Sequence, residues 1–241
     1  MSMRYKGGVI SATAPTTSSS SAKGVWTLPQ QLQAIAAGNW PSPPPTTIGQ
    51  AYGGGFYAGQ IGVSSVATHY IVVGPVSTAQ NAATSWKNVN TATTGADSVI
   101  DGPQNTADMV ADGNSTVYPA AHFCNNLVIG GYSDWYMPAL NELEVCYYNL
   151  KPTTTNNVTS SGINANAVPA RASNYTTSIP AQTSVTDFQS TGAEDFAVAY
   201  YWSSTETGAT YAKHQFFSNG NQVNTYKNDV SSVRAIRRVA V

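Results

Sequence analysis

The most regular pattern of hydrophobic positions lies just past the middle of the chain. Apolar residues recur there at three- and four-residue spacing, at Leu140, Leu143, Tyr147 and Leu150. This spacing places them on one face of a helix, and that face can point into a core. Pro138 stands where a first helical turn tolerates proline, and Glu142 and Glu144 lie near the positive end of the helix dipole. The pattern therefore predicts a helix that begins near Pro138 and buries one side.

Short runs of β-branched and aromatic residues predict strands on either side of this helix. Residues 69–73 form the clearest early strand, which ends at Gly74. After the helix, the pattern predicts four short strands, at 200–205, 210–218, 222–227 and 232–239. Asn219 and Gly220 separate the second from the third, and an Asn-Gly pair between strand-like runs is a strong hairpin signal.

Further helices are expected at 105–112, where Gly113 stops the pattern, and at 119–127. Residues 151–192 contain few large apolar groups and many Asn, Ser and Thr, so they are expected to form long surface loops with one helical turn near 185–189.

The beginning of the chain has a different character. Residues 1–24 are rich in Ser and Thr and predict an extended arm, in which Val9 and Ile10 add a short strand. Trp26 and Leu28 open a short helix that continues to about residue 37, with Leu32 on its apolar side. Residues 40–45 are rich in proline, which favours a stiff extended spacer. We therefore expect an N-terminal arm over residues 1–45 and a folded domain over 46–241.

Charge is scarce. Charged residues make up 10% of the 241 residues and the formal net charge is −1, whereas a typical soluble domain carries about 25% charged residues. A nucleic-acid-binding protein would show a basic face, so no nucleic-acid partner is expected. No apolar run approaches the length of a membrane helix, and no membrane insertion is expected.

The residues that carry chemistry do not form a recognisable catalytic or metal motif. His69, His122 and His214 are scattered, and no second pair of ligands at zinc spacing follows Cys124. Cys124 and Cys146 lie on two predicted helices, where a disulfide is possible, although buried free thiols are the simpler interpretation. No Gly-x-Ser-x-Gly elbow accompanies the many serines. We expect no metal, no cofactor and no enzymatic activity.

The acidic residues near tryptophans have a structural interpretation. Trp135 and Trp202 are expected in the core. Asp134 and Glu206 are expected to be buried acceptors that pair with arginines, the candidates being Arg234 and Arg237. Glu142 and Glu144 stand two apart on a helix and so do not face each other as a carboxylate pair.

Three blocks, in order, carry a family resemblance. They are Gly-Gly-Tyr-Ser-Asp-Trp-Tyr-Met-Pro at 130–138, Tyr-Trp-Ser-Ser-Thr at 201–205, and Val-Arg-Ala-Ile-Arg-Arg at 233–238. Together they resemble the C-terminal domain of the Legionella collagen-like adhesin family over about residues 50–241. The resemblance implies an α+β, C-type-lectin-like domain with short antiparallel strands, two or three helices and long loops. Such domains occur in bacterial surface proteins and in tail or fibre proteins of bacteriophages. Residues 1–40 resemble a leader of cyanobacterial phage structural proteins.

The predicted hairpin at 210–227 is the candidate recognition surface, because Tyr, Asn and Ser make adaptable binding surfaces at low entropy cost. Its candidate ligand-binding residues are Tyr211, His214, Phe216, Asn221, Asn224 and Tyr226. It also resembles the region that retroelements diversify in lectin-like phage proteins. We expect Phe217 to point inward and His214 outward; an ordinary solvated hairpin is the alternative. The Glu-Pro-Asn and Gln-Pro-Asp triplets of calcium-dependent lectins are absent, so no calcium is expected.

These observations predict a phage virion protein of the tail-fibre or receptor-binding type, and they leave a purely structural virion component (a capsid decoration, fibre or tail adaptor protein) as the alternative. The arm would dock to other virion proteins through Val9, Ile10, Trp26, Leu28 and Leu32. The domain would bind a host surface glycan or protein, as a homo-oligomer with a trimer favoured. The first residues are not followed by an apolar signal segment. This fits the expectation of a protein that is assembled into a particle in the host cytoplasm, after which the particle becomes extracellular.

Overall fold

The computed structural model describes residues 17–18, 21–22, 27–36 and 44–241. The chain divides into two compact units, Met1–Pro44 and Pro45–Val241. The described elements of the first unit are the paired strands β1 (Thr17–Ser18) and β2 (Ser21–Ala22) and the helix α1 (Leu28–Ala36).

Two of the five residues predicted to dock on the particle, Leu28 and Leu32, lie on α1 and are exposed. The other three, Val9, Ile10 and Trp26, lie outside the described residues.

The second unit is a mixed α+β fold, as predicted, built mostly from strands in two sheets. The four-stranded sheet is antiparallel and has the order β11-β5-β4-β3, with β3 at Ala51–Tyr52, β4 at Gly55–Val63, β5 at Val66–Val73 and β11 at Ile236–Ala240. The five-stranded sheet has the order β6-β10-β7-β8-β9, with β6 at Gln80–Ser85, β7 at Tyr200–Glu206, β8 at Tyr211–Phe216, β9 at Gln222–Tyr226 and β10 at Val230–Arg234. Its strands are antiparallel except for the pairing of β10 with β7.

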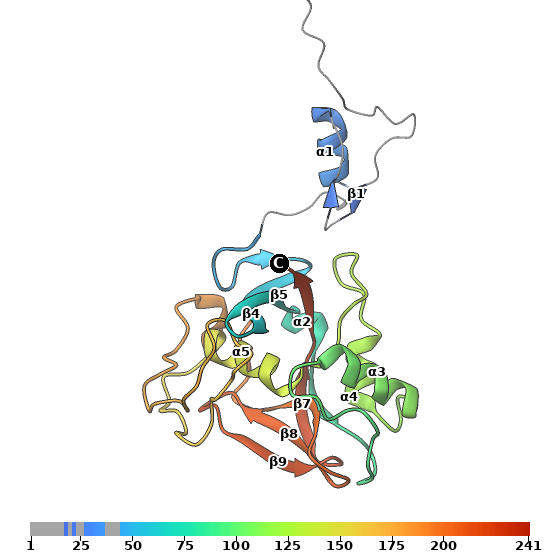
Figure 1. Ribbon diagram of the computed structural model, residues 1–241, viewed down its shortest axis with the longest axis vertical. Helices are drawn as coiled ribbons and strands as arrows, with labels where there is room; N and C mark the ends of the chain where they lie inside the picture. The colour runs from blue at the N-terminus through green and yellow to red at the C-terminus, as the bar shows by residue number, and fades with distance from the viewer. Residues whose placement is uncertain (1–16, 19–20, 23–26, 37–43) are drawn as a thin grey trace, which may run out of the picture. The chain divides into compact units, whose positions relative to one another are not determined.

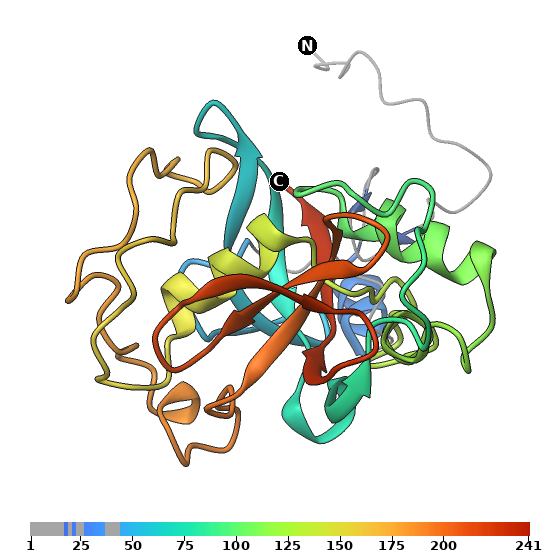
Figure 2. The ribbon, with the colours of Figure 1, turned by 90° about the horizontal axis from the view of Figure 1, so that it is seen from below.

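The helices of this unit are α2 (Val76–Ala79), α3 (Gly102–Asp112), α4 (Pro119–Asn125), α5 (Leu140–Leu150) and the 3-10 turn η1 (Thr186–Phe188). Helix α5 runs through the middle of the unit, with the long loops of residues 151–192 on one side and α3 and α4 on the other (Figures 1 and 2). The predicted turn near 185–189 and the stop at Gly113 are confirmed.

Helix α5 begins at Leu140, so Pro138 lies before the helix and not in its first turn as predicted. Glu142, in the first turn, caps the start of the helix, because its carboxylate accepts a hydrogen bond from the backbone N–H of Ala139 at 2.8 Å. A carboxylate at this position satisfies a free donor and complements the helix dipole.

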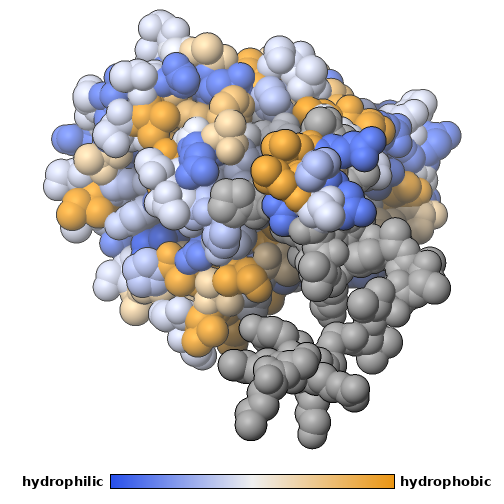
Figure 3. Space-filling view, turned by 90° about the horizontal axis from the view of Figure 1, so that it is seen from above, coloured by the Kyte–Doolittle hydropathy of each residue, from blue (hydrophilic) through white to orange (hydrophobic). Residues whose placement is uncertain are grey.

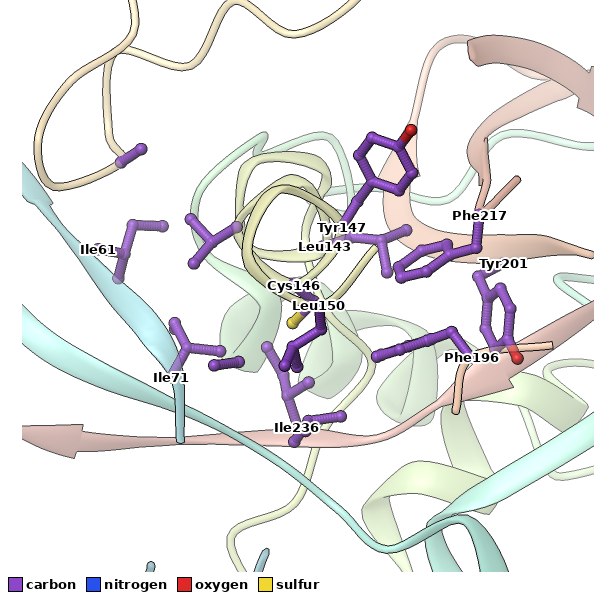
Figure 4. Close-up of a cluster of buried hydrophobic side chains, with 14 of the residues drawn as sticks. Ile61, Ile71, Leu143, Cys146, Tyr147, Leu150, Phe196, Tyr201, Phe217 and Ile236 are labelled. Carbon is purple, nitrogen blue, oxygen red and sulfur yellow. The ribbon is translucent and has the colours of Figure 1, made fainter. Parts of the chain in front are cut away.

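The predicted apolar face of α5 fills the space between the two sheets. Figure 4 shows Leu143, Cys146, Tyr147 and Leu150 projecting from the helix toward side chains of both sheets. The helix packs against β4 and β5 of one sheet and β7 and β8 of the other. We call this cluster the α5 core; its largest other members are Ile61, Ile71, Tyr136, Tyr175, Phe188, Phe196, Tyr201, Phe217 and Ile236.

A second cluster, the tryptophan core, lies under α3 and α4. Its members include Val72, Trp86, Met109, Tyr118, Trp135, Met137, Trp202, Val233 and Ala235. Two adjacent residues of β7 belong to different cores: Tyr201 lies in the α5 core and Trp202 in the tryptophan core. Side chains alternate across a strand, so β7 is buried on both faces. Trp135 and Trp202 are buried as predicted, with 2% and 0% of their surface exposed.

The prediction of a single strand over residues 232–239 is wrong in one respect. The chain changes sheets at Ala235, so that β10 belongs to the five-stranded sheet and β11 to the four-stranded one. The backbone N–H of Ala235 donates to Ala79 at 2.9 Å, and its carbonyl accepts from Gly74 at 3.0 Å.

No helix in the described part of the chain has the length and hydrophobicity to cross a membrane. On the face shown in Figure 3, hydrophobic residues lie in small groups among hydrophilic ones.

Candidate functional site

The β8–β9 hairpin (Figure 1) carries the residues predicted to bind a ligand. It divides them between two faces. The strand register pairs Tyr211 with Tyr226. Because side chains alternate along a strand, Asn224 shares the face of this pair, whereas His214 and Phe216 belong to the opposite face. The six predicted residues therefore do not form one surface, and Asn221 lies in the turn that precedes β9.

One face of the hairpin presents a pair of exposed tyrosines. Tyr211 and Tyr226 keep 39% and 47% of their surface exposed, and their ring centroids lie 5.0 Å apart. A hydrogen bond with Tyr226 raises the pKa of Tyr211. Asn224, two residues before Tyr226, is also exposed and pairs across the strands with Lys213. We call Tyr211, Asn224 and Tyr226 the tyrosine face.

The expectation that His214 points outward is wrong. Its surface is 7% exposed, and its ring stacks on Tyr200 with centroids 4.0 Å apart. Burial lowers the pKa of His214 to about 4. Phe217 is buried as predicted, but Ala212, which shares the face of β8 with His214, is also buried.

A depression of about 410 Å³ opens on the His214 side of the sheet. Its lining residues are Ala82, Ala199, Tyr200, His214, Thr225, Asp229, Val230, Ser231 and Ser232. We call it the His214 pocket. Of these residues, only His214 was predicted as a site residue. The others come from β6, β7, β9, β10 and adjoining turns, which meet only because β10 inserts between β6 and β7.

The His214 pocket does not have the geometry of a catalytic triad. His214 Nδ1 lies 3.3 Å from the Ser231 hydroxyl. A triad needs a carboxylate that holds the other ring nitrogen, and in the described part of the chain no carboxylate is hydrogen-bonded to His214 Nε2. A general base works best with a pKa near the working pH, and the pKa of His214 is about 4. The arrangement is suited to binding.

An ion pair joins the sequence block at 130–138 to the distant block at 233–238. Arg237 donates to both carboxylate oxygens of Asp134, at 2.7 and 2.8 Å, and to the carbonyl of Gly53 at 3.0 Å. Its guanidinium lies 3.9 Å from the ring centroid of Tyr132. The predicted pairing is confirmed, but the Asp134 side chain is 55% exposed and not buried as expected.

The second predicted pairing is wrong. Glu206 pairs with Lys227 at 2.7 Å, and Arg234 pairs with Glu194 at 2.8 Å. The reason is that the two sites lie in different cores. Arg234 lies over the ring of Phe196 in the α5 core, whereas Lys227 lies over Trp86 in the tryptophan core.

The two buried carboxylates of α5 have separate sets of donors. Glu142 accepts from the Tyr136 hydroxyl at 2.5 Å and from Arg238 Nε at 2.6 Å. Glu144 accepts from Asn164, Tyr175 and Arg171. Since these donors saturate both groups, neither is available to act on a substrate.

A larger depression, of about 590 Å³, lies at the end of β11 and includes His69, Asp101, Asp134 and Arg238. Its charges are already paired. Arg238 bonds Glu142 and lies 3.7 Å from Asp101, and Asp134 bonds Arg237.

Cys124 and Cys146 are free and buried, which confirms the simpler of the two interpretations. Burial raises the pKa of both thiols, so neither is an activated nucleophile. The described residues contain no group of three or more His, Cys, Asp or Glu side chains placed to hold a metal ion. Nε2 of His122, on α4, lies 2.7 Å from the carbonyl oxygen of Gly113.

No protein-family model matches the chain, and a search of the curated proteins gives no match. The geometry alone describes an α+β domain with a tyrosine face and a hydroxyl-lined pocket on opposite sides of one hairpin.

Proposed function

We propose that this chain is a phage virion protein of the tail-fibre or receptor-binding type. Residues 46–241 bind the host cell surface, and residues 1–45 attach the protein to other virion proteins. The observation that carries the proposal is the tyrosine face. Two exposed tyrosines and an asparagine stand on paired strands, and such residues give large contact area and adaptable hydrogen bonding at low entropy cost.

The proposal includes a C-type-lectin-like identity for the α+β unit. It is supported by the way the three sequence blocks meet within that unit. The first block leads into α5 and is tied to the third by Asp134 and Arg237. The second block lies on β7, and the third begins on β10, which pairs with β7 in the five-stranded sheet. Long loops over residues 151–192 fit the same fold.

The low charge fits a particle surface that contacts its partners through hydrogen bonds and aromatic rings. In this proposal the protein has no catalytic role. Its partners are a host surface glycan or protein and further copies of the chain, with a trimer as the expected state. The protein assembles in the host cytoplasm and acts on the extracellular particle.

The test is adsorption to host cells by particles that carry Tyr211→Ala, Asn224→Ala or Tyr226→Ala. Each variant is expected to fold, because the side chains are exposed, and to adsorb less than the parent. Val128→Ala is the control, since Val128 is 71% exposed and is not part of the hairpin. If all three variants adsorb like the parent, the protein is a structural component such as a capsid decoration or tail adaptor.

A further inference from the structure

Three polar atoms of the residues that line the His214 pocket have no hydrogen-bond partner in the described part of the chain. The hydroxyl of Tyr200, Nε2 of His214 and Oδ1 of Asp229 make no hydrogen bond with another described residue. Thr225, Ser231 and Ser232 also line the pocket, and their hydroxyl groups are hydrogen-bonded to Asp229, His214 and the carbonyl of Ala82. A ligand that fills this pocket therefore meets both donors and acceptors.

These groups are held in place without a ligand. The Tyr200 ring stacks on His214 and also on Phe216, with centroids 4.0 and 4.6 Å away. Ser231 holds the imidazole of His214. Thr225 donates to Asp229 and so holds its carboxylate. Groups that are ordered before binding lose little entropy when a ligand arrives.

The charge of the pocket selects against acidic ligands. None of its lining residues is Lys or Arg, and Asp229 contributes a negative charge. Burial keeps the imidazole of His214 neutral at pH 7, because it lowers the pKa to about 4. An anionic ligand would meet a carboxylate without a compensating cation, which is unfavourable.

Ligand hydroxyl groups fit these polar atoms best. A hydroxyl group donates to a carboxylate in a charge-assisted hydrogen bond and also accepts from a phenol. A ligand with adjacent hydroxyls can therefore satisfy Asp229 and Tyr200 together. The volume of about 410 Å³ falls in the range of roughly 300–1,000 Å³ for small-molecule sites.

From this geometry we infer that the His214 pocket binds a neutral sugar residue, with Asp229, Tyr200 and His214 as its hydrogen-bonding groups. The inference goes beyond the role of the tyrosine face, because it concerns a second site on the opposite side of the hairpin. It rests on the pocket alone, so that it stands or fails separately from attachment to host cells.

The experiment titrates the purified full chain with methyl glycosides of glucose, galactose and mannose and with N-acetylglucosamine. Binding is followed by calorimetry and by the NMR signals of the His214 imidazole. Glucuronic acid is the anionic probe. At least one neutral sugar is expected to bind and to shift the His214 signals, with glucuronic acid binding more weakly.

Two variants test the assigned groups, each with a matched control. Asp229→Asn removes the free carboxylate, and Tyr200→Phe removes one hydroxyl while keeping the ring stack. Each is expected to weaken binding roughly tenfold, as for the loss of one charge-assisted or well-placed hydrogen bond. Asp187→Asn and Tyr148→Phe make the same chemical changes at positions outside both the pocket and the tyrosine face, and are expected to bind like the parent.

Three results would overturn the inference. The first is that no neutral sugar, at millimolar concentration, shifts the NMR signals of the His214 imidazole. The second is unchanged affinity in both Asp229→Asn and Tyr200→Phe. The third is that glucuronic acid binds as tightly as the best neutral sugar. Loss of host adsorption in the tyrosine-face variants, with sugar binding intact, would support both sites independently.

Discussion

Lys227 is fully buried and holds its Nζ 2.7 Å from a carboxylate oxygen of Glu206. The same ammonium donates to the carbonyl of Thr91 at 2.8 Å and lies over the ring of Trp86. Glu206 also accepts the backbone N–H of Thr93 at 2.8 Å. Removing one member of such a pair leaves the other charge buried without its partner.

We expect Glu206→Gln to destabilise the protein by about 3–5 kcal/mol, because Lys227 then remains charged in the tryptophan core. Asp134→Asn is the comparison, since Asp134 is 55% exposed and water replaces part of what it loses. Urea unfolding of both variants measures the difference. Equal, small losses in the two variants would show that the buried pair contributes little.

The two motif tryptophans are expected to be essential for folding. Trp135→Ala and Trp202→Ala should each cost about 3–5 kcal/mol, a large part of a total stability of roughly 5–15 kcal/mol. Tyr226→Ala should change stability little, because 47% of that side chain is exposed. Thermal unfolding followed by circular dichroism is the measurement. Tryptophan variants that melt like the parent would contradict the assignment of the tryptophan core.

Acidification should destabilise the protein partly through His214. Its pKa is about 4 in the folded protein and about 6.5 in an unfolded chain, so the unfolded state binds more protons between these values. The contribution of His214 is present above pH ~6.5 and is lost as the pH falls toward ~4, with a slope of at most about 1.4 kcal/mol per pH unit. The fall in melting temperature from pH ~7 to pH ~5 should therefore be smaller in His214→Gln than in the parent. An identical fall in both proteins would contradict the burial of this imidazole.

A chain that begins at Thr46 should fold as stably as the full chain, because Pro45–Val241 forms a compact unit with both hydrophobic cores. The same truncated protein should not be incorporated into particles if residues 1–45 attach it to the virion. Melting temperature and particle composition are the two measurements. A truncated protein that fails to fold would contradict the first expectation, and one that is fully incorporated would contradict the second.

The elements with strong local patterns were predictable from sequence. The apolar face of α5 follows from its spacing, and the hairpin turn follows from Asn219 and Gly220. The strands β4 and β6 were not predicted, since the glycines of β4 and the small polar residues of β6 weaken the local strand pattern. Their pairing partners are distant, so only the assembled sheets reveal them.

The candidate site was less predictable. The alternation of residues along a strand assigns each side chain to one of two faces, but it does not show which other elements pack over each face. His214 was expected outside, yet Tyr200 and Ser231 cover it from neighbouring strands. The partner of Glu206 was missed for a similar reason. Lys227 and Arg234 are both cations late in the chain, and only the three-dimensional arrangement places one over Trp86 and the other over Phe196, in different cores.

The insertion of β10 between β6 and β7 also has a consequence for folding kinetics. Residue 85 of β6 pairs with Val230 of β10, so the five-stranded sheet closes only through a contact between segments far apart in sequence. Chains rich in such contacts fold slowly, because the entropy of loop closure is lost before the contacts form. During synthesis, β6 emerges long before its partner and must wait with an unpaired edge. Substitutions that keep the edge of β6 unpaired for longer during folding are therefore expected to lower the yield of folded protein more than they lower its final stability.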